Sequence, residues 1–195
     1  MTDSGRQLLE SEGINPLRIP DSVISVEVLC LNRICKGVGI KNRHGGMEFF
    51  SRDYPINGLV NINHSEVLMF SSSKKMTSHS CCLFADMLDY LSYLTLLGEP
   101  EGEKLPRNCD CFVMNDVNNF IAIMLDTISY DHVYCLFPNT DTGKTMEKTI
   151  ISKNQSRAIA ESELYNNYES LHEYVKVVRQ HEKKTNTKFE ICMMM

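Results

Sequence analysis

The stretch that decides the fold runs from Ser80 to Pro100 and reads SCCLFADMLDYLSYLTLLGEP. Gly98 and Pro100 are placed to end a helix here. Ser92 is not part of the apolar stripe of this helix, which is described next, and we expect it to tolerate substitution by alanine. The apolar residues recur every three or four positions, which draws one stripe along the helix: Phe84, Met87, Leu88, Leu91, Leu94 and Leu97. We therefore expect a long amphipathic helix over residues 80–97 that packs through this stripe.

Short strand candidates lie on both sides of this helix. β-Branched and alternating runs before it predict strands at 23–31, 34–40, 47–50, 59–62 and 66–70. After a polar linker, four further strands are expected at 109–114, 120–125, 132–137 and 146–151. Four strands at this spacing, joined by turn residues, are typical of a small, strongly bent barrel. A second amphipathic helix at 170–180 and a last strand at 189–195 complete the pattern.

Composition and charge restrict the class of protein. The 195 residues are 43% hydrophobic and 23% charged, which predicts a chain with a core of its own. Twenty basic against 25 acidic residues give a net charge of −5, whereas nucleic-acid binders usually carry a basic excess. We therefore expect no direct binding to duplex nucleic acid. The polar residues 1–20, which include Pro16 and Pro20, are expected to be a flexible leader, and residues 21–195 a single unit.

No apolar stretch has the length of a membrane span, so we expect a cytoplasmic protein without a membrane partner. The eight cysteines are then expected to be reduced and to act as small buried hydrophobes.

Chemistry-bearing motifs are incomplete. The run Thr142-Gly-Lys-Thr145 resembles the end of a phosphate-binding loop, but Pro138 stands where that motif needs glycine. The closest cysteine pairs lack the two-residue spacing of a zinc hook. We expect no metal, no cofactor and no catalytic residue. A small enzyme that uses His79 or His64 with a cysteine remains an alternative.

One resemblance involves the middle of the chain. The run from Cys109 to Met124 (CDCFVMNDVNNFIAIM), followed by 132–143 (HVYCLFPNTDTG), resembles the hairpin and strand of extended Tudor domains. The helices at 80–97 and 170–180 and the strand at 189–195 take the places of the family's connecting helix and closing elements. The order agrees over about residues 59–195, although few residues are identical. The resemblance implies an α+β, mainly β fold: a Tudor-like barrel at about 108–155 and a partial nuclease-like (OB-type) barrel, joined by a long helix.

Family members bind methylarginine in an aromatic cage, through cation–π attraction. The cage positions fall near Met114, Phe120 and Cys135, with Phe137 close by on the same strand. A fourth falls at Pro138 or Thr142. The expected peptide-binding region is thus a degenerate cage of Met114, Phe120, Cys135 and Phe137. The alternative for Phe120 and Phe137 is simple core packing.

The expected function is therefore that of a non-enzymatic adaptor that binds a peptide, Arg-Gly-rich by analogy with the family. The resemblance implies germline small-RNA (piRNA-type) complexes in the cytoplasm, in cytoplasmic granules or beside the nucleus. A methylarginine reader with an altered cage is a further alternative. The sequence leaves the partner and the oligomeric state open.

Overall fold

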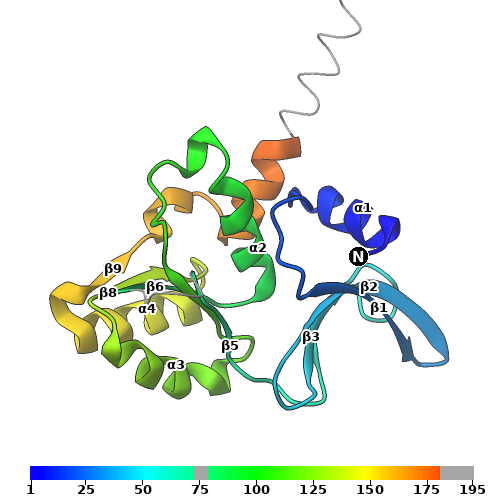
Figure 1. Cartoon of the computed structure of the whole chain (residues 1–195), viewed down its shortest axis with the longest axis horizontal. Coiled ribbons are helices and arrows are strands. Elements are labelled where there is room, and N and C mark those ends of the chain that lie inside the picture. The colour runs from blue at the N-terminus through cyan, green and yellow to red at the C-terminus, as the bar shows by residue number, and fades with distance from the viewer. Residues whose placement is uncertain (73–78, 181–195) are drawn as a thin grey trace, which may run out of the picture.

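The computed structural model describes residues 1–72 and 79–180, and two β-sheets organise them (Figure 1). The first sheet is an antiparallel meander with its four strands in chain order. These strands are β1 (Val23–Cys30), β2 (Arg33–Lys41), β3 (Met47–Ser51) and β4 (Gly58–Ile62). Each agrees with its predicted range to within one residue, because β-branched runs bounded by turn residues identify hairpin strands well.

The first 20 residues do not form a flexible leader. Helix α1 (Asp3–Ser11) begins at Thr2, whose side chain accepts a hydrogen bond from the Gly5 amide at 3.3 Å. Leu9 and Ile14 are buried in the main core. Only a few apolar residues anchor this segment to the core. The sequence of residues 1–20 is mainly polar, and so few apolar residues do not predict that the segment is ordered.

The second sheet has the strand order β5-β7-β6-β8-β9. Strands β6, β7, β8 and β9 run parallel, and β5 is antiparallel to β7. Parallel neighbours need crossover connections, which are usually helices. The strands are β5 (Leu68–Phe70), β6 (Ser80–Phe84), β7 (Asp110–Val113), β8 (His132–Leu136) and β9 (Ala158–Ala160). The crossover connections contain the helices α2 (Met87–Leu96), α3 (Phe120–Asp126) and α4 (Asp141–Asn154). The predicted α+β class is confirmed.

The Tudor-like barrel expected at about 108–155 is not what these residues form. The ranges 120–125 and 146–151, predicted as strands, lie in α3 and α4. The run FIAIML is apolar on all sides, so its periodicity does not separate strand from helix. For α4 the sequence holds a signal that was missed. Thr140 caps the helix, and Gly143, Met146 and Ile150 recur at helical spacing on its buried side.

The long helix predicted at 80–97 is two elements. Residues 80–84 form β6, in the middle of the parallel sheet, and the helix begins only after Asp86, whose side chain accepts from the Asp89 amide at 3.0 Å. A short apolar run such as SCCLF suits a buried strand as well as a helix. Residues 171–180 are helical as predicted, and the strand predicted at 189–195 lies outside the described residues.

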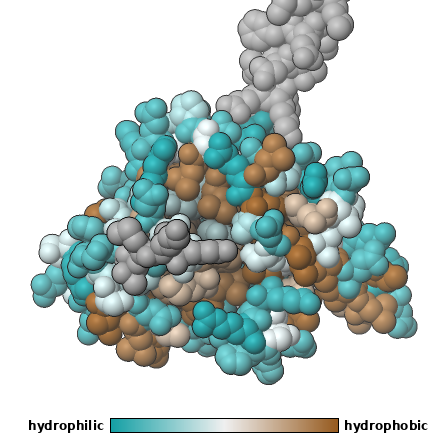
Figure 2. Space-filling view, viewed as in Figure 1, coloured by the Kyte–Doolittle hydropathy of each residue, from teal (hydrophilic) through white to brown (hydrophobic). Residues whose placement is uncertain are grey.

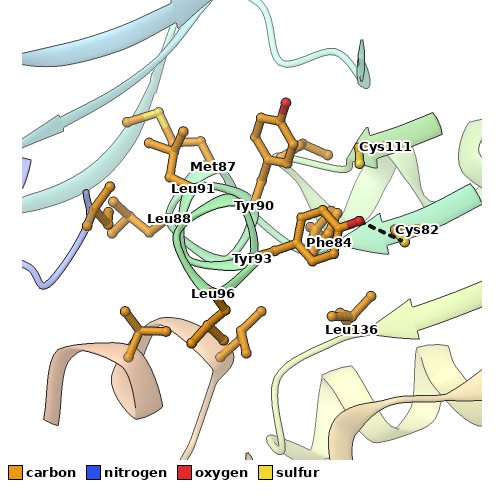
Figure 3. Packing of buried hydrophobic residues seen from close by; sticks show 14 of the residues in the cluster. Cys82, Phe84, Met87, Leu88, Tyr90, Leu91, Tyr93, Leu96, Cys111 and Leu136 are labelled. Carbon is orange, nitrogen blue, oxygen red and sulfur yellow. Dashed lines mark hydrogen bonds between the residues drawn. The ribbon is translucent and has the colours of Figure 1, made fainter. Parts of the chain in front are cut away.

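Helix α2 is covered on every side, mostly by apolar residues (Figure 3). Leu88 and Leu91 point toward the first sheet and the N-terminal segment. Tyr90 and Tyr93 point toward the second sheet, where both rings pack against the Phe84 ring, and nearly the whole helix is buried. One core therefore joins both sheets. None of the described helices is long and apolar enough to cross a membrane.

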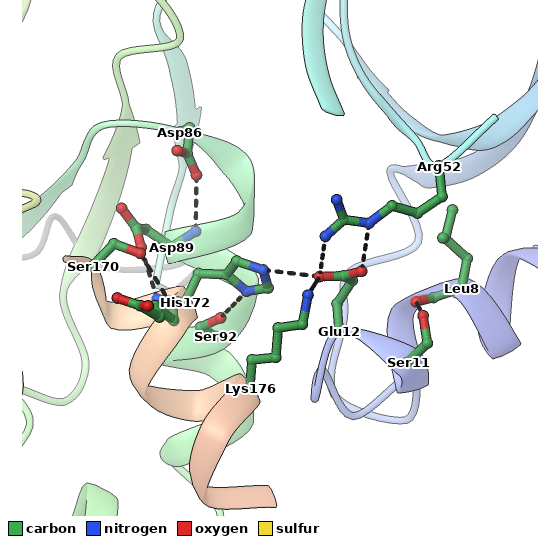
Figure 4. A network of polar contacts seen from close by, with 11 residues as sticks. Leu8, Ser11, Glu12, Arg52, Asp86, Asp89, Ser92, Ser170, His172 and Lys176 are labelled. Carbon is green, nitrogen blue, oxygen red and sulfur yellow. Dashed lines mark hydrogen bonds and ion pairs between the residues drawn. The ribbon is translucent and has the colours of Figure 1, made fainter. Parts of the chain in front are cut away.

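A polar network joins the same elements on the other side of α2 (Figure 4). Arg52, at the end of β3, makes two hydrogen bonds of 2.8 Å to the Glu12 carboxylate, and Lys176 makes a third of 2.8 Å. His172 lies 3.3 Å from Glu12 and also 3.3 Å from the Ser92 hydroxyl. Ser92 is thus buried inside the packing, contrary to the expectation from the stripe.

Candidate functional site

The carboxyl ends of the parallel strands are the first place to look for a ligand site. The chain passes from β6 to β7 on one side and then to β8 on the other. Open α/β sheets bind ligands at such a switch point, in the crevice beyond the strand ends. In this chain the corresponding position is marked by the loops that follow β6 (85–86), β7 (114–116) and β8 (137–140); we call these loops the carboxyl edge.

The polar groups of the carboxyl edge are used in structural bonds. Asp86 caps α2, and the Thr140 hydroxyl accepts from the Gly143 amide at 3.1 Å to cap α4. The Asn139 side chain donates to the carbonyl oxygens of Tyr165 and Tyr168 at 3.0 and 2.9 Å. These groups therefore position backbone segments.

The loop after β7 is committed in the same way. The Asn115 side-chain amide donates to the Glu66 carbonyl at 2.8 Å, and the Asp116 carboxylate accepts from the Asn118 amide at 2.8 Å. The Asn115 side-chain oxygen is buried without a hydrogen-bond partner. One orphaned oxygen, without a second group directed at the same point, does not define a ligand.

Three carboxyl groups lie behind the edge, around the start of α2. Burial raises the pKa of Glu48 and of Asp89, and repulsion from Asp86 raises both further. Burial also raises the pKa of Asp86 itself. Glu48 accepts from the Met87 amide at 3.0 Å and so ties β3 to α2. Glu48 and Asp89 are buried, so these groups are structural rather than a solvent-accessible acid and base. Across residues 1–72 and 79–180, no group of His, Cys, Asp and Glu is arranged to hold a metal ion.

The predicted peptide-binding residues do come together, but inside the protein. Met114, Cys135 and Phe137 are each at most 3% exposed, in the second hydrophobic cluster between the parallel sheet and α3 and α4. Phe120 is half-buried and packs against the same cluster. These four residues therefore form core and not a cage that is open to a guanidinium. Phe120 and Phe137 therefore pack in the core, which was the alternative to a role in a cage.

The alternative Cys–His pair has no supporting geometry. His79 Nδ1 lies 3.0 Å from Asp131 Oδ2 on the surface, and Cys81 is fully buried. Burial raises the pKa of the Cys81 thiol, whereas a nucleophilic cysteine needs a lowered one. His64 is exposed.

An exposed apolar stripe lies instead on the outer side of α3. Together with the short helical turns at Val117–Asn119 and Thr127–Ser129, α3 forms one helical run. Its inner residue Ile123 is buried, but four large side chains on the outer side are more than half exposed. These are Val117 (55%), Ile121 (72%), Leu125 (63%) and Ile128 (62%), which we call the α3 stripe. Hydrophobic residues gather on the surface in the part of the view where α3 lies (Figure 2).

The charges around the α3 stripe are mostly negative. Asp126 is the only charged residue of the helical run, and Asp116 and Asp131 lie just beyond its ends. Arg157 is near, but its guanidinium donates to the carbonyl oxygens of Ile128 and Tyr130. The spacing of the stripe, i, i+4, i+8 and i+11, is present in the sequence. The strand expected over residues 120–125 does not reveal this spacing, because a strand places alternate residues, and not every fourth residue, on one face.

Comparisons with known proteins do not place the chain in a family. No family model matches, and no curated protein matches. Among solved structures, the primase fragment of the bacteriophage T7 primase-helicase protein is similar at 7% identity with a TM-score of 0.46. The match includes 80% of this chain and 60% of that one. A likeness at this level identifies neither a shared fold nor a shared activity.

Proposed function

We propose that the protein is a non-enzymatic adaptor that binds a partner protein through the α3 stripe. The observation that carries the proposal is the exposure of four large apolar side chains on one side of a helix whose other side is already in the core. A helix that is hydrophobic all round is normally buried all round. Exposed apolar patches rimmed by polar residues mark interaction sites.

The chemistry of the stripe specifies the kind of partner. Residues at i, i+4, i+8 and i+11 present a straight apolar ridge, which pairs well with the apolar side of another amphipathic helix. Asp116, Asp126 and Asp131 favour Lys or Arg at the flanks of that helix. The partner is therefore an amphipathic helical segment with an apolar seam and basic flanks.

The carboxyl edge supports the non-enzymatic part of the proposal. Its Asp86, Asn139 and Thr140 side chains are bound to neighbouring backbone groups, and those bonds would have to break before the side chains could act on a substrate. The proposal retains the adaptor function expected from the sequence. The germline small-RNA setting depended on the Tudor-like barrel and is not part of it.

A phage-displayed library of amphipathic helices, selected on the intact protein, tests this function. Peptides that are enriched should share an apolar seam with Lys or Arg beside it. Ile121→Asp should weaken their binding by about tenfold or more, which corresponds to roughly 1.4 kcal/mol.

Leu17 supplies a matched control, because it is 88% exposed and lies outside α3. Leu17→Asp should leave the affinity of the selected peptides unchanged. Selected peptides that bind Ile121→Asp as tightly as the unchanged protein would show that the stripe is not the binding site.

A further inference from the structure

Strand β1 forms an edge of the first sheet. It pairs with β2 on one side, and its other side has no neighbouring strand among the described residues. Its eight residues, VISVEVLC, contain no proline and only one charge, Glu27. Natural proteins usually shorten, charge or cover such an edge, because its free backbone groups recruit another strand.

The outward backbone groups of β1 follow from the turn that ends it. Leu31 and Asn32 both have positive φ, at 47° and 59°, as in a two-residue type I′ turn. In such a hairpin the flanking pair, Cys30 and Arg33, is hydrogen-bonded, and the bonded pairs then alternate along the strands. The amide and carbonyl groups of Glu27 and Leu29 therefore point away from β2.

An independent bond agrees with this alternation. The Val23 amide, which belongs to the same outward set, donates to the Pro20 carbonyl at 3.0 Å and not to β2.

The tip of this hairpin is apolar and strained. Leu29 and Ile34 are paired across the strands, and they are 72% and 59% exposed. Leu31 is 76% exposed and has a backbone conformation that favours Gly, Asn or Asp. A surface patch is thus maintained at a cost in backbone strain, which is typical of positions that contact a ligand or partner.

We propose that the β1 edges of two copies of this chain pair antiparallel about a two-fold axis near Leu29, which joins the two first sheets into one continuous sheet. Setting Leu29 opposite Leu29 of the second copy places Leu29 and Ile34 of both chains in one apolar row. It also keeps the two Glu27 carboxylates apart, and each retains its ion pair with Lys36 at 3.4 Å.

The charges favour this register over the alternative. A register centred on Glu27 would place like charges directly opposite, which is unfavourable in a strand pair. The edge thus fits a second copy of itself in a two-fold interface. Because only the end of one strand takes part, the contact is smaller than a standard interface and weak, with a dissociation constant on the order of 100 µM.

Amide hydrogen exchange at two protein concentrations tests the pairing on the intact chain. At about 1 mM, compared with about 20 µM, the amide of Leu29 should exchange roughly fourfold more slowly, because most chains are then paired. The amides of Val26 and Val28 bond to β2 and should be protected at both concentrations. Equal exchange of the Leu29 amide at the two concentrations would overturn the proposal.

Analytical ultracentrifugation of two variants separates this edge from the α3 stripe. Leu29→Lys places a charge at the centre of the pair and should leave the chain monomeric, whereas Leu125→Lys on α3 should dimerise like the unchanged protein. A dimer that persists in Leu29→Lys, or that only Leu125→Lys abolishes, would contradict pairing through β1. A chain that stays monomeric throughout would contradict it as well.

Discussion

Helices α2 and α3 have similar compositions and opposite surroundings. Both consist mostly of apolar residues, MLDYLSYLTL in α2 and FIAIMLD in α3, and both belong to crossovers of the same parallel sheet. Helix α2 lies between the two sheets, and nearly every residue of it is buried. Helix α3 lies on the other face of the sheet, and Ile123 is its only fully buried residue.

The difference shows on which side of the parallel sheet apolar side chains remain exposed to solvent. On the α2 side, the apolar surface of the parallel sheet and of α2 is covered by other elements. These are the first sheet, α1 and the helix at 171–180. On the α3 side nothing in the described residues performs that role for Ile121 and Leu125. We therefore expect folding stability to depend mainly on α2, and we propose α3 as the side that binds a partner.

The largest effect is expected from truncating the same residue type in the two helices. Leu91→Ala on α2 should lower the free energy of unfolding by about 2–5 kcal/mol, because Leu91 is fully buried in the core that joins the sheets. Leu125→Ala on α3 should change it by less than about 0.5 kcal/mol. Urea denaturation of both variants measures the difference, and equal losses would mean that α3 is covered like α2.

A smaller effect is expected at Glu12, which connects α1 to the closing helix beside α2. Burial alone would raise the pKa of Glu12, but hydrogen bonds from His172, Arg52 and Lys176 outweigh it and hold the pKa well below its ordinary value. Glu12→Gln should cost about 1–3 kcal/mol at pH 7, at the low end for a buried ion pair because Arg52 and Lys176 are partly exposed.

The pH dependence of that cost follows from the direction of the pKa shift. A carboxylate with a depressed pKa in the folded state stabilises the protein above the unfolded pKa of about 4.5, and this contribution is lost as the pH falls toward the folded pKa. The difference in unfolding free energy between the unchanged protein and Glu12→Gln should therefore shrink below about pH 4.5. A difference that stays constant down to pH 3 would contradict the network.

The smallest effect on stability is expected from placing charge on the stripe itself. Ile121→Lys should change the free energy of unfolding by less than about 0.5 kcal/mol, because the side chain is 72% exposed. The same variant should reduce binding of a hydrophobic fluorescent dye, since it interrupts the apolar ridge. Marked destabilisation would mean that Ile121 packs against the protein in solution.

The first sheet could be predicted from the sequence, and the arrangement of the second could not. Hairpin strands such as β1 and β2 are bounded by local turn signals that a single sequence displays. In the parallel sheet, β6 is a short apolar run of five residues, and only its neighbours β7 and β8 decide that it is a strand. The partners that settle this choice are distant in the sequence.

The candidate site shows the same limit. The prediction that Cys135 and Phe137 bind a peptide depends on their alignment with a family's sequence pattern. Such a pattern does not say whether a side chain is buried, because burial is decided by the folded chain. The spacing of Val117, Ile121 and Leu125 was visible in the sequence. The sequence does not show that these three side chains face solvent. In the folded chain they do, because Ile123, on the opposite side of the helix, occupies the core.

Chemical-shift mapping by NMR, with a helical peptide selected on the intact protein, shows directly whether the α3 stripe is the binding site. We expect the largest amide shift changes within residues 117–131 and little change at residues 85–86 and 137–140 of the carboxyl edge. Changes concentrated at the carboxyl edge would contradict this expectation, because that result would place binding at the switch point of the parallel sheet and leave the α3 stripe without a role.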